Sequence, residues 1–523
     1  MNFSKIYRFI LVFNLVAPVF SQGTEVDDFL KFHVLDRETE APLVYATVIF
    51  SSSGIGVITD GDGQFRVPLV YKTAKDSLII SSLGYETLYV SLETYGLNGI
   101  HKLYANPKIE SLDEIKLFAG RKRKKWSPGK IVEEAIRRIP QNYPVTPHAY
   151  IAYYRDYQKL RGRDTGRYHK PDNTTYLNLN EGIIQVYDAG FGTDQLKNEL
   201  NQTVLFKYEM NDSFPTDSNL SIPYDNFRRK YLEGVNISPL GGNELNLINL
   251  ANAIRNYNRM SFSFANVFGK NFLKNHFFRL KGVQYLKNEP FYMIDFSSNH
   301  TKVTPRYRAY GNIVVSTIDF GIQHLDYSLV NDYENRKLYS ISIEYKSRGD
   351  LYYLNYITFN NYFEVRPEAE FTVEKVSYLE SDRSFLFYFN RDVDPGTLGK
   401  SHKKFKISIR GKPLDVTDAV LISPKVVQVL VKPFTSNFDL IPKKQFYFET
   451  DKVKDISGRM VNERKLLSAD QFRELFVQQV RPEATLDSTF DFVDKSSPLR
   501  ASRINDYNGP EVFWINSPLK GYK

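Results

Sequence analysis

The eight histidines are the residues best suited to metal or acid–base chemistry, but they are spread along the chain. None is followed four residues later by a second His, the spacing that places two imidazoles on one helix face for zinc. The sequence contains no Cys, which excludes thiolate metal sites, a cysteine nucleophile and disulfides. We therefore predict no metal site. The histidines are His33, His101, His148, His169, His276, His300, His324 and His402.

Other catalytic motifs are missing or incomplete. No Ser carries the flanking glycines of a nucleophile elbow, and no Rossmann or Walker signature is present. Gly399-Lys400-Ser401 matches the end of a phosphate loop, but Asp394 stands where that loop needs its first Gly. Glycosidase carboxylates come from distant strands and leave no short motif, and Asp295, Asp319 and Glu344 lie on predicted strands. We predict no catalytic residue and no cofactor, with a hydrolase as the alternative.

Two charged segments have a binding and a structural interpretation. Asp60-Gly61-Asp62-Gly63 is acidic, but it lacks the third acidic position and the distal Glu of a calcium loop, so we predict a plain turn. The basic run of five residues favours a solvated linker, with peripheral contact to an anionic membrane surface as the alternative. This run is Arg121, Lys122, Arg123, Lys124 and Lys125.

The composition indicates a folded, mostly β protein of several domains. The 523 residues are too many for one hydrophobic core, and 42% apolar with 25% charged residues is ordinary globular usage. Aromatic residues make up 15% of the chain and favour pleated, half-buried surfaces. The net charge of +9 is spread along the sequence apart from the one basic run, so we predict no nucleic-acid partner.

Residues 1–21 have the pattern of a cleaved secretory signal peptide. Lys5 and Arg8 precede an apolar run from Phe9 to Phe20, which is shorter than the roughly 20 residues of a membrane-spanning helix. Cleavage after Ser21 would leave Gln22 first. Because no Cys is available for lipid attachment, we expect an exported, non-lipidated protein of the bacterial periplasm or outer-membrane surface.

Residues 28–105 predict a small antiparallel β-sandwich, because short β-rich runs alternate with Gly, Asp and Ser turns. This segment resembles the carboxypeptidase-regulatory-like domain, a transthyretin-like β-sandwich found in exported proteins of the Bacteroidota type. The resemblance implies an accessory domain without peptidase chemistry, since a fold does not imply an activity. The residues that carry it are Pro42, Ala46, Asp60, Gly63, Phe65, Gly84 and Tyr85.

The middle of the chain predicts a linker with a short helix at 106–144, followed by a β-rich domain at 145–366. Ser127 and Pro128 mark a helix start, and Pro140 is expected to end it. A second helix is expected at 243–257. The combination resembles the half-barrel of lipoprotein-carrier proteins, a curved antiparallel sheet around a helix. Strands are predicted at 148–160, 176–190, 275–286, 290–298, 310–330, 337–348 and 351–365.

Residues 370–462 predict a seven-stranded sandwich that resembles the bacterial Ig-like domain, on Phe389-Asn390, Val393-Asp394-Pro395 and the run 453–458. For residues 463–523 we expect a helix and a tail. Ser468 and Gln471 form a capping box ahead of an amphipathic helix, and Trp514 is expected to dock inside the protein.

These observations favour a non-enzymatic cell-envelope protein for binding or assembly, whose partner is a protein, a glycan or a lipid. The alternatives are an envelope hydrolase acting on glycans or peptides, and a carrier of lipid or another apolar ligand on the central curved sheet. A pocket with two carboxylates would favour the hydrolase. A dry groove would favour the carrier.

Overall fold

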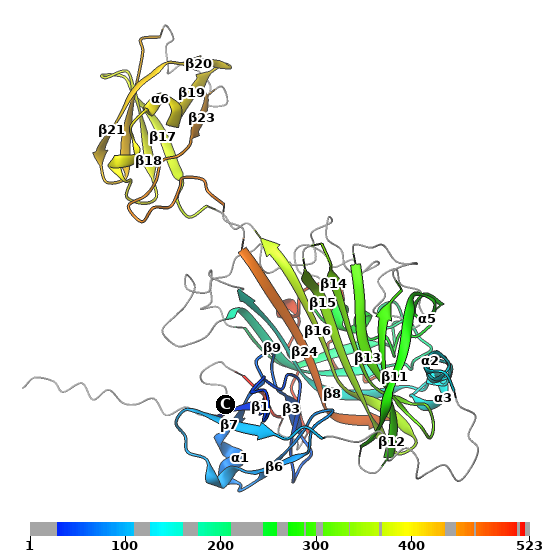
Figure 1. Ribbon diagram of the computed structural model, residues 1–523. Coiled ribbons are helices and arrows are strands. Elements are labelled where there is room, and N and C mark those ends of the chain that lie inside the picture. The colour runs from blue at the N-terminus through cyan, green and yellow to red at the C-terminus, as the bar shows by residue number, and fades with distance from the viewer. Residues whose placement is uncertain are drawn as a thin grey trace, which may run out of the picture.

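The computed structural model describes residues 29–108, 126–160, 176–210, 244–258, 270–286, 289–299, 307–333, 335–365, 369–434, 446–464, 467–509 and 513–517. The expected signal peptide at 1–21 and the basic run at 121–125 lie outside these residues. The described chain is mostly β, as predicted, and forms an N-terminal sandwich, a large curved sheet and a second sandwich (Figure 1).

The N-terminal sandwich consists of two small sheets. One has the order β4 (Gln64–Pro68), β1 (Phe29–Asp36), β7 (Ile100–Ala105), with α1 (Leu69–Thr73) following β4. The other has the order β3 (Gly56–Ile58), β2 (Thr47–Phe50), β5 (Ser77–Ser81), β6 (Leu88–Ser91), followed by η1 (Leu92–Thr94). The sandwich was predicted, but β1 and β7 pair in parallel, so it is not wholly antiparallel.

The first signature residues shape the core and turns of this N-terminal sandwich. Pro42 forms an isolated bridge with Leu35, and the backbone N–H of buried Ala46 donates to Thr59 Oγ1 at 2.9 Å. Phe65 is buried and stacks on Phe32 with ring centroids 5.0 Å apart.

The remaining signature residues define two turns. Gly63 has φ +71°, a left-handed conformation that glycine adopts without a steric cost. Gly84, at φ +83°, precedes Tyr85, whose hydroxyl donates to Asp36 Oδ2 at 2.7 Å. The Asp60 side chain accepts the N–H groups of Asp62 and Gln64 at 3.0 and 2.8 Å and so closes a turn.

The central unit is a ten-stranded sheet with the order β10-β9-β8-β24-β16-β15-β14-β13-β12-β11, and all its neighbouring strands are antiparallel. Eight of its strands lie on the seven segments that the sequence predicted, since the segment 310–330 contains both β13 and β14, and β10 was missed. The strands are β8 (His148–Leu160), β9 (Tyr176–Asp188), β10 (Gln202–Met210), β11 (His276–Leu286), β12 (Glu289–Ser298), β13 (Tyr307–Ser316), β14 (Ile322–Asn331), β15 (Arg336–Arg348), β16 (Leu351–Val365) and β24 (Leu467–Pro482).

The strand β24 corrects the expected C-terminal helix. The segment that begins at the supposed capping box of Ser468 and Gln471 is the strand that joins β8 to β16 in the middle of the sheet. Phe472 packs on Tyr157 on one face, whereas Leu475 belongs to the core on the other face. Burial on both faces removes the alternation that normally identifies a strand.

Helices cover one face of the large sheet. They are α2 (Pro128–Arg137), α3 (Ile139–Asn142), α4 (Leu245–Ala251) and α5 (Lys270–Asn275). Ile131 of α2 and Leu247 of α4 share a core with Ile294 and Ile341 of the sheet. Ser127 occupies the N-cap of α2 without a side-chain bond, and Pro140 lies in the first turn of α3 instead of ending α2. α4 is shorter than the helix expected at 243–257.

The opposite face of the large sheet is covered in part by the N-terminal sandwich. Ile58 packs against Tyr356 and Phe476, and Tyr153 and Ile183 of β8 and β9 belong to the sandwich's own core. Over β11 to β15 we call the same face the open face, because among the described residues it carries exposed side chains such as Phe277 and Tyr310.

A buried ion pair lies beneath this interface. Arg155 Nη2 and Glu474 Oε2 are 2.6 Å apart, and both side chains are almost fully buried. The hydroxyl of Tyr157 donates to Glu474 Oε1 at 2.6 Å, and Arg155 Nη1 donates to the carbonyl oxygen of Asn516 at 3.0 Å. The pair therefore connects β8, β24 and the segment 513–517.

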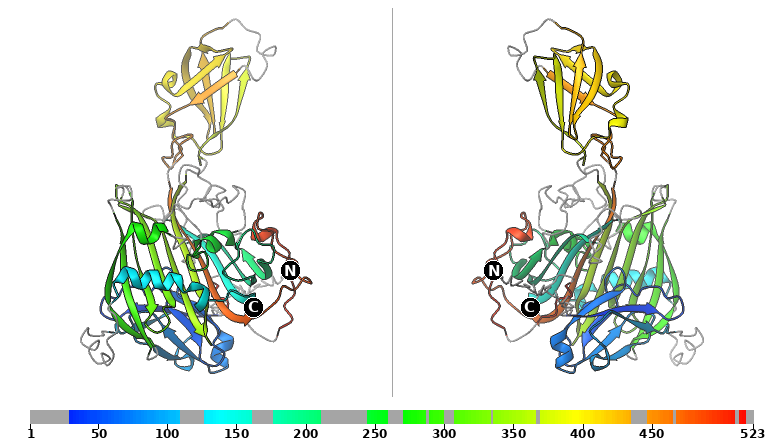
Figure 2. Two further views of the ribbon diagram at one scale, coloured as in Figure 1. Left: turned by 90° about the vertical axis from the view of Figure 1, so that its right-hand side faces the viewer. Right: turned by 90° about the vertical axis from the view of Figure 1, so that its left-hand side faces the viewer.

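The described residues of the second sandwich form seven strands, the number predicted. One sheet has the order β17 (Val373–Leu379), β18 (Ser384–Phe389), β22 (Val426–Val431), β21 (Val416–Ser423), and the other β20 (Lys412–Leu414), β19 (Phe405–Ile409), β23 (Phe446–Thr450). It also contains η4 (Pro395–Thr397) and α6 (Ser401–Lys404), and η7 (Leu499–Ala501) follows later in the chain. It stands apart from the other units and is inserted between β16 and β24, which pair directly (Figures 1 and 2). The resemblance to the bacterial Ig-like family stays a prediction.

Candidate functional site

The open face of the large sheet carries two rows of polar and aromatic side chains. The strand register places residues of adjacent strands opposite one another, so residues far apart in sequence become neighbours. The first row across β11 to β16 is Arg279, Asp295, Asn312, Asp326, Ser342 and Thr358. The second row is Phe277, Ser297, Tyr310, Ser328 and Ser340.

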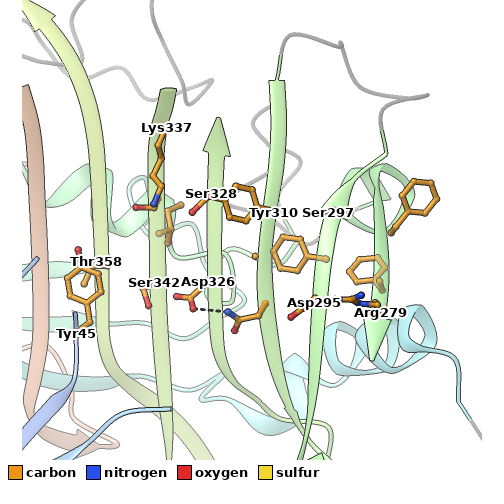
Figure 3. A pocket seen from close by; sticks show the side chains of 17 residues that line it. Tyr45, Arg279, Asp295, Ser297, Tyr310, Asp326, Ser328, Lys337, Ser342 and Thr358 are labelled. Carbon is orange, nitrogen blue, oxygen red and sulfur yellow. Dashed lines mark hydrogen bonds and ion pairs between the residues drawn. The ribbon is translucent and has the colours of Figure 1, made fainter. Parts of the chain in front are cut away.

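These rows form the floor of a groove of about 840 Å³ (Figure 3). Tyr45 of the N-terminal sandwich closes one end, where its hydroxyl is hydrogen-bonded to the Asn360 side chain. At the other end Phe277 is 60% exposed, and Tyr310 is 37% exposed. These two rings lie on strands two apart, a separation of about 10 Å, so one ligand can contact both.

Asp326 is held as a carboxylate in the middle of the first row. His324 Nε2 lies 2.9 Å from Asp326 Oδ2, and Asn312 Nδ2 donates to the same oxygen at 2.9 Å. Burial opposes ionisation, but the charge and hydrogen bond of His324, with bonds from Ser342 and Asn312, outweigh it and lower the pKa of Asp326 to about 2. Asp326 is therefore ionised at neutral pH and cannot serve as a general acid.

Asp295 is balanced by two cations. Its Oδ2 lies 3.4 Å from Arg279 Nη2 and 3.5 Å from Lys281 Nζ, and all three side chains are at least one-third exposed. These contacts leave the carboxylate and the guanidinium reachable by a ligand. The carboxylate and the guanidinium are suited to hydrogen bonding with polar groups of a ligand, since each can bond through two atoms.

Asn312 supplies an unused acceptor in the groove. Its amide nitrogen donates to Asp326, while its Oδ1 is buried and has no hydrogen-bond partner in the described part of the chain. A buried polar atom without a partner is uncommon and calls for an explanation such as a ligand or water.

The three carboxylates singled out in the sequence do not come together. Asp295 lines the groove, as described. Asp319 lies in the turn after β13, where Oδ1 accepts the Gly321 N–H at 2.8 Å. Glu344 on β15 accepts from Asn355 Nδ2 at 2.8 Å, and neither it nor Asp319 lines the groove.

Tyr45 and Asp326 were not among the predicted site residues. Asp326 had a detectable signal, because Asp326 and Ser328 alternate with the buried residues Leu325 and Tyr327 along β14, and both line the groove. Tyr45 had none, since it reaches the groove from another unit.

Neither a metal cluster nor a membrane helix is found in the described ranges. No group of three or more His, Asp or Glu side chains there could hold a metal ion. No helix within those same ranges is both long enough and apolar enough to span a bilayer.

Comparisons with known proteins give one family and a few distant structures. The chain is 13% identical to a LolA superfamily protein from Nitrosomonas europaea, covering 45% of this chain and 86% of that one, with a TM-score of 0.18. For a DUF1329 family protein from Desulfovibrio piger the identity is 9%, the coverage 45% and 87%, and the TM-score 0.18. For the MucA/MucB complex of Pseudomonas aeruginosa the identity is 8%, the match covers 68% of this chain and 99% of that one, and the TM-score is 0.14.

TM-scores this low do not establish a shared fold. A search of the curated proteins gives no match. The family model of the CarboxypepD_reg-like domain matches residues 32–116, which include most of the N-terminal sandwich and its signature residues. The chain therefore carries a carboxypeptidase-regulatory-like domain at residues 32–116.

Proposed function

We propose that this protein is a non-enzymatic binding protein of the bacterial cell envelope and that the groove on its large sheet binds a glycan. The observation that carries the proposal is the pairing of exposed rings at Phe277 and Tyr310 with a row of charged and amide side chains. The C–H faces of a sugar ring can pack on such rings, while its hydroxyls donate to carboxylates and accept from Arg.

The state of the carboxylates favours binding over hydrolysis. Asp295 and Asp326 both line the groove, which is the observation that favours the hydrolase alternative. Glycosidases need one carboxylic acid that is protonated near neutral pH, and Asp326, with a pKa of about 2, cannot fill that role, so a hydrolase would depend on Asp295 for it.

The helices on the opposite face disfavour the apolar-ligand alternative. Ile131, Val132 and Ala135 of α2 and Ile248 of α4 are buried against the apolar side of the sheet. The surface that would shelter an acyl chain is thus filled by side chains of the protein itself.

Export is the second part of the proposal, and its support is the sequence pattern of residues 1–21. Fractionation of cells with mass mapping of the N-terminus tests it. We expect the protein in the envelope fraction with Gln22 first. Recovery only from the cytoplasm, with Met1 retained, would contradict it.

Glycan binding is tested by screening soluble fragments of envelope glycans with the purified protein and titrating any that bind by calorimetry. Replacing Tyr310 by Ala should weaken binding about two- to tenfold, because an aromatic contact contributes about 0.5–1.5 kcal/mol. The matched control is Tyr333→Ala, since Tyr333 is 78% exposed and does not line the groove.

The same titration separates the alternatives. Equal binding by the Tyr310→Ala and Tyr333→Ala variants would refute the groove as the site. Mass spectrometry of the recovered glycan would detect shortened products if the protein were a hydrolase, and Asp295→Asn should then abolish them.

A further inference from the structure

Residues 513–517 lie in the seam between the two sheets of the N-terminal sandwich. β4 is an edge strand of one sheet and β3 is an edge strand of the other. The segment bonds to both: Asn516 Oδ1 accepts the N–H of Arg66 on β4 at 2.8 Å, and Asn516 Nδ2 donates to the carbonyl oxygen of Ile58 on β3 at 3.5 Å. A segment from the far end of the described chain thus covers both open edges.

Trp514 anchors this segment. It is fully buried, and its ring centroid lies 4.3 Å from that of Phe50 and 6.3 Å from that of Phe65. The indole N–H donates to the carbonyl oxygen of Arg66 at 2.9 Å, so the polar atom of the ring is satisfied in the apolar seam. A large aromatic side chain seated in a closed pocket with one hydrogen bond is the usual form of a binding hot spot.

Gln478 holds the backbone of the anchor residue. Its Nε2 donates to the carbonyl oxygens of Trp514 and Gly56 at 2.6 and 3.0 Å, and its Oε1 accepts the Trp514 N–H at 3.1 Å. Gln478 is the extra residue where the pairing of β24 with β8 shifts between Val477 and Gln479. A β-bulge re-aims a side chain, and this one directs the amide into the seam.

The segment is held as a peptide ligand is held. Residues 513–517 belong to none of the described strands, and each of their hydrogen bonds given above has a side chain as donor or acceptor. The strands β1 to β7 make up both small sheets without them. The anchors are Trp514 and, two residues later, Asn516.

We infer that the seam between β3 and β4 is a binding site for an extended peptide with a Trp anchor and an Asn two residues later, and that residues 513–517 fill it as a ligand carried on the same chain. An exchangeable occupant distinguishes this site from an ordinary part of the core. The inference does not depend on what the groove binds.

The test uses the whole chain with a protease site inserted between Gly509 and Phe513. After cleavage, a fluorescein-labelled synthetic peptide of residues 510–523 is added and its anisotropy is followed. We expect the labelled peptide to replace the cleaved tail and to bind saturably. A peptide carrying Trp514→Ala should need an about 100-fold higher concentration for half-saturation, as expected for a hot-spot residue.

The protein side of the site is tested with Gln478→Ala. This variant should release the labelled peptide about tenfold faster, because it loses the bonds to the Trp514 backbone. Gln428→Ala in the second sandwich is the matched control, since Gln428 also projects a bonded amide from a strand, to Ser384 Oγ at 2.9 Å. Its release rate should be unchanged.

Two results would overturn the inference. The first is equal competition by the peptides with and without Trp514. The second is a cleaved tail that leaves only when the whole protein unfolds, measured by amide hydrogen exchange of the central sheet, because the tail would then be part of the fold.

Discussion

Replacing Arg155 by Met should destabilise the protein by about 3–5 kcal/mol, the cost of leaving one partner of a buried ion pair alone. Met is similar in length but removes the bonds from Nε and Nη2 to Glu474 Oε2, at 3.1 and 2.6 Å. It also removes the 3.0 Å bond to the Asn516 carbonyl. Glu474 keeps only the Tyr157 hydroxyl among the partners described above.

A second substitution should restore part of this stability. Glu474→Gln in the Arg155→Met background removes the isolated charge, so the double variant should be more stable than Arg155→Met by about 2 kcal/mol. The pKa of Glu474 is raised, chiefly by burial, and Arg155 and Tyr157 oppose the rise. Because the folded state then binds the proton more tightly, this carboxyl favours folding at acidic pH and loses that effect as pH rises.

The assay is urea unfolding followed by Trp514 fluorescence in a Trp126→Phe background, which leaves one Trp in the chain. Trp514 lies two residues from Asn516, the contact of Arg155, so it reports on this junction. Arg308→Met is the control, because Arg308 and Asp332 form a partly exposed pair at 3.0 Å whose loss should cost about 0–1 kcal/mol. A double variant no more stable than Arg155→Met would refute the reasoning.

Three further outcomes are expected. Burial lowers the pKa of His276 to about 4. The unfolded chain therefore binds the proton more tightly, and the free energy of unfolding should fall by about 2–3 kcal/mol when the pH is lowered from above 6.5 to 4.5. His276→Gln should remove this fall from a pH series of urea unfolding curves. Gly63→Ala should cost about 1–2 kcal/mol in thermal unfolding, because φ is +71° and the new Cβ would lie 2.8 Å from the Val34 carbonyl oxygen; a neutral effect would contradict the turn geometry. Residues 370–462 expressed alone should melt cooperatively by circular dichroism, since their core draws only on residues within that range, and a featureless melt would count against an independent domain.

Most of the large sheet could be predicted because its strands alternate. Ile341 and Ile343 face the core, while Ser340 and Ser342 face the groove, and this period of two is visible in the sequence. The strand β24 could not be predicted in this way. Phe472, Leu475 and Phe476 have helical spacing, but the strand is buried on both faces, so its hydrophobic residues need not alternate.

The candidate site was only partly predictable for a different reason. Its floor combines strands whose register is set by pairing, and one end is closed by Tyr45, 315 residues from its partner Asn360 along the chain. The docking of Trp514 inside the protein was predicted from its chemistry. Its pocket was not predicted, because no sequence pattern near residue 514 indicates a contact with Phe50 or Arg66. Contacts of such long sequence separation are invisible to arguments from short segments.

The position of β24 governs the order in which this chain can fold. Until residue 482 has been synthesised, β10-β9-β8 and β16 to β11 are two separate half-sheets, with the edges of β8 and β16 unpaired. Unpaired edges invite association with other chains, and pairings of high sequence separation form slowly. We therefore expect a nascent chain of this protein to expose these two edges until β24 has been made, and a premature stop before β24 to give an aggregation-prone product rather than a smaller working protein.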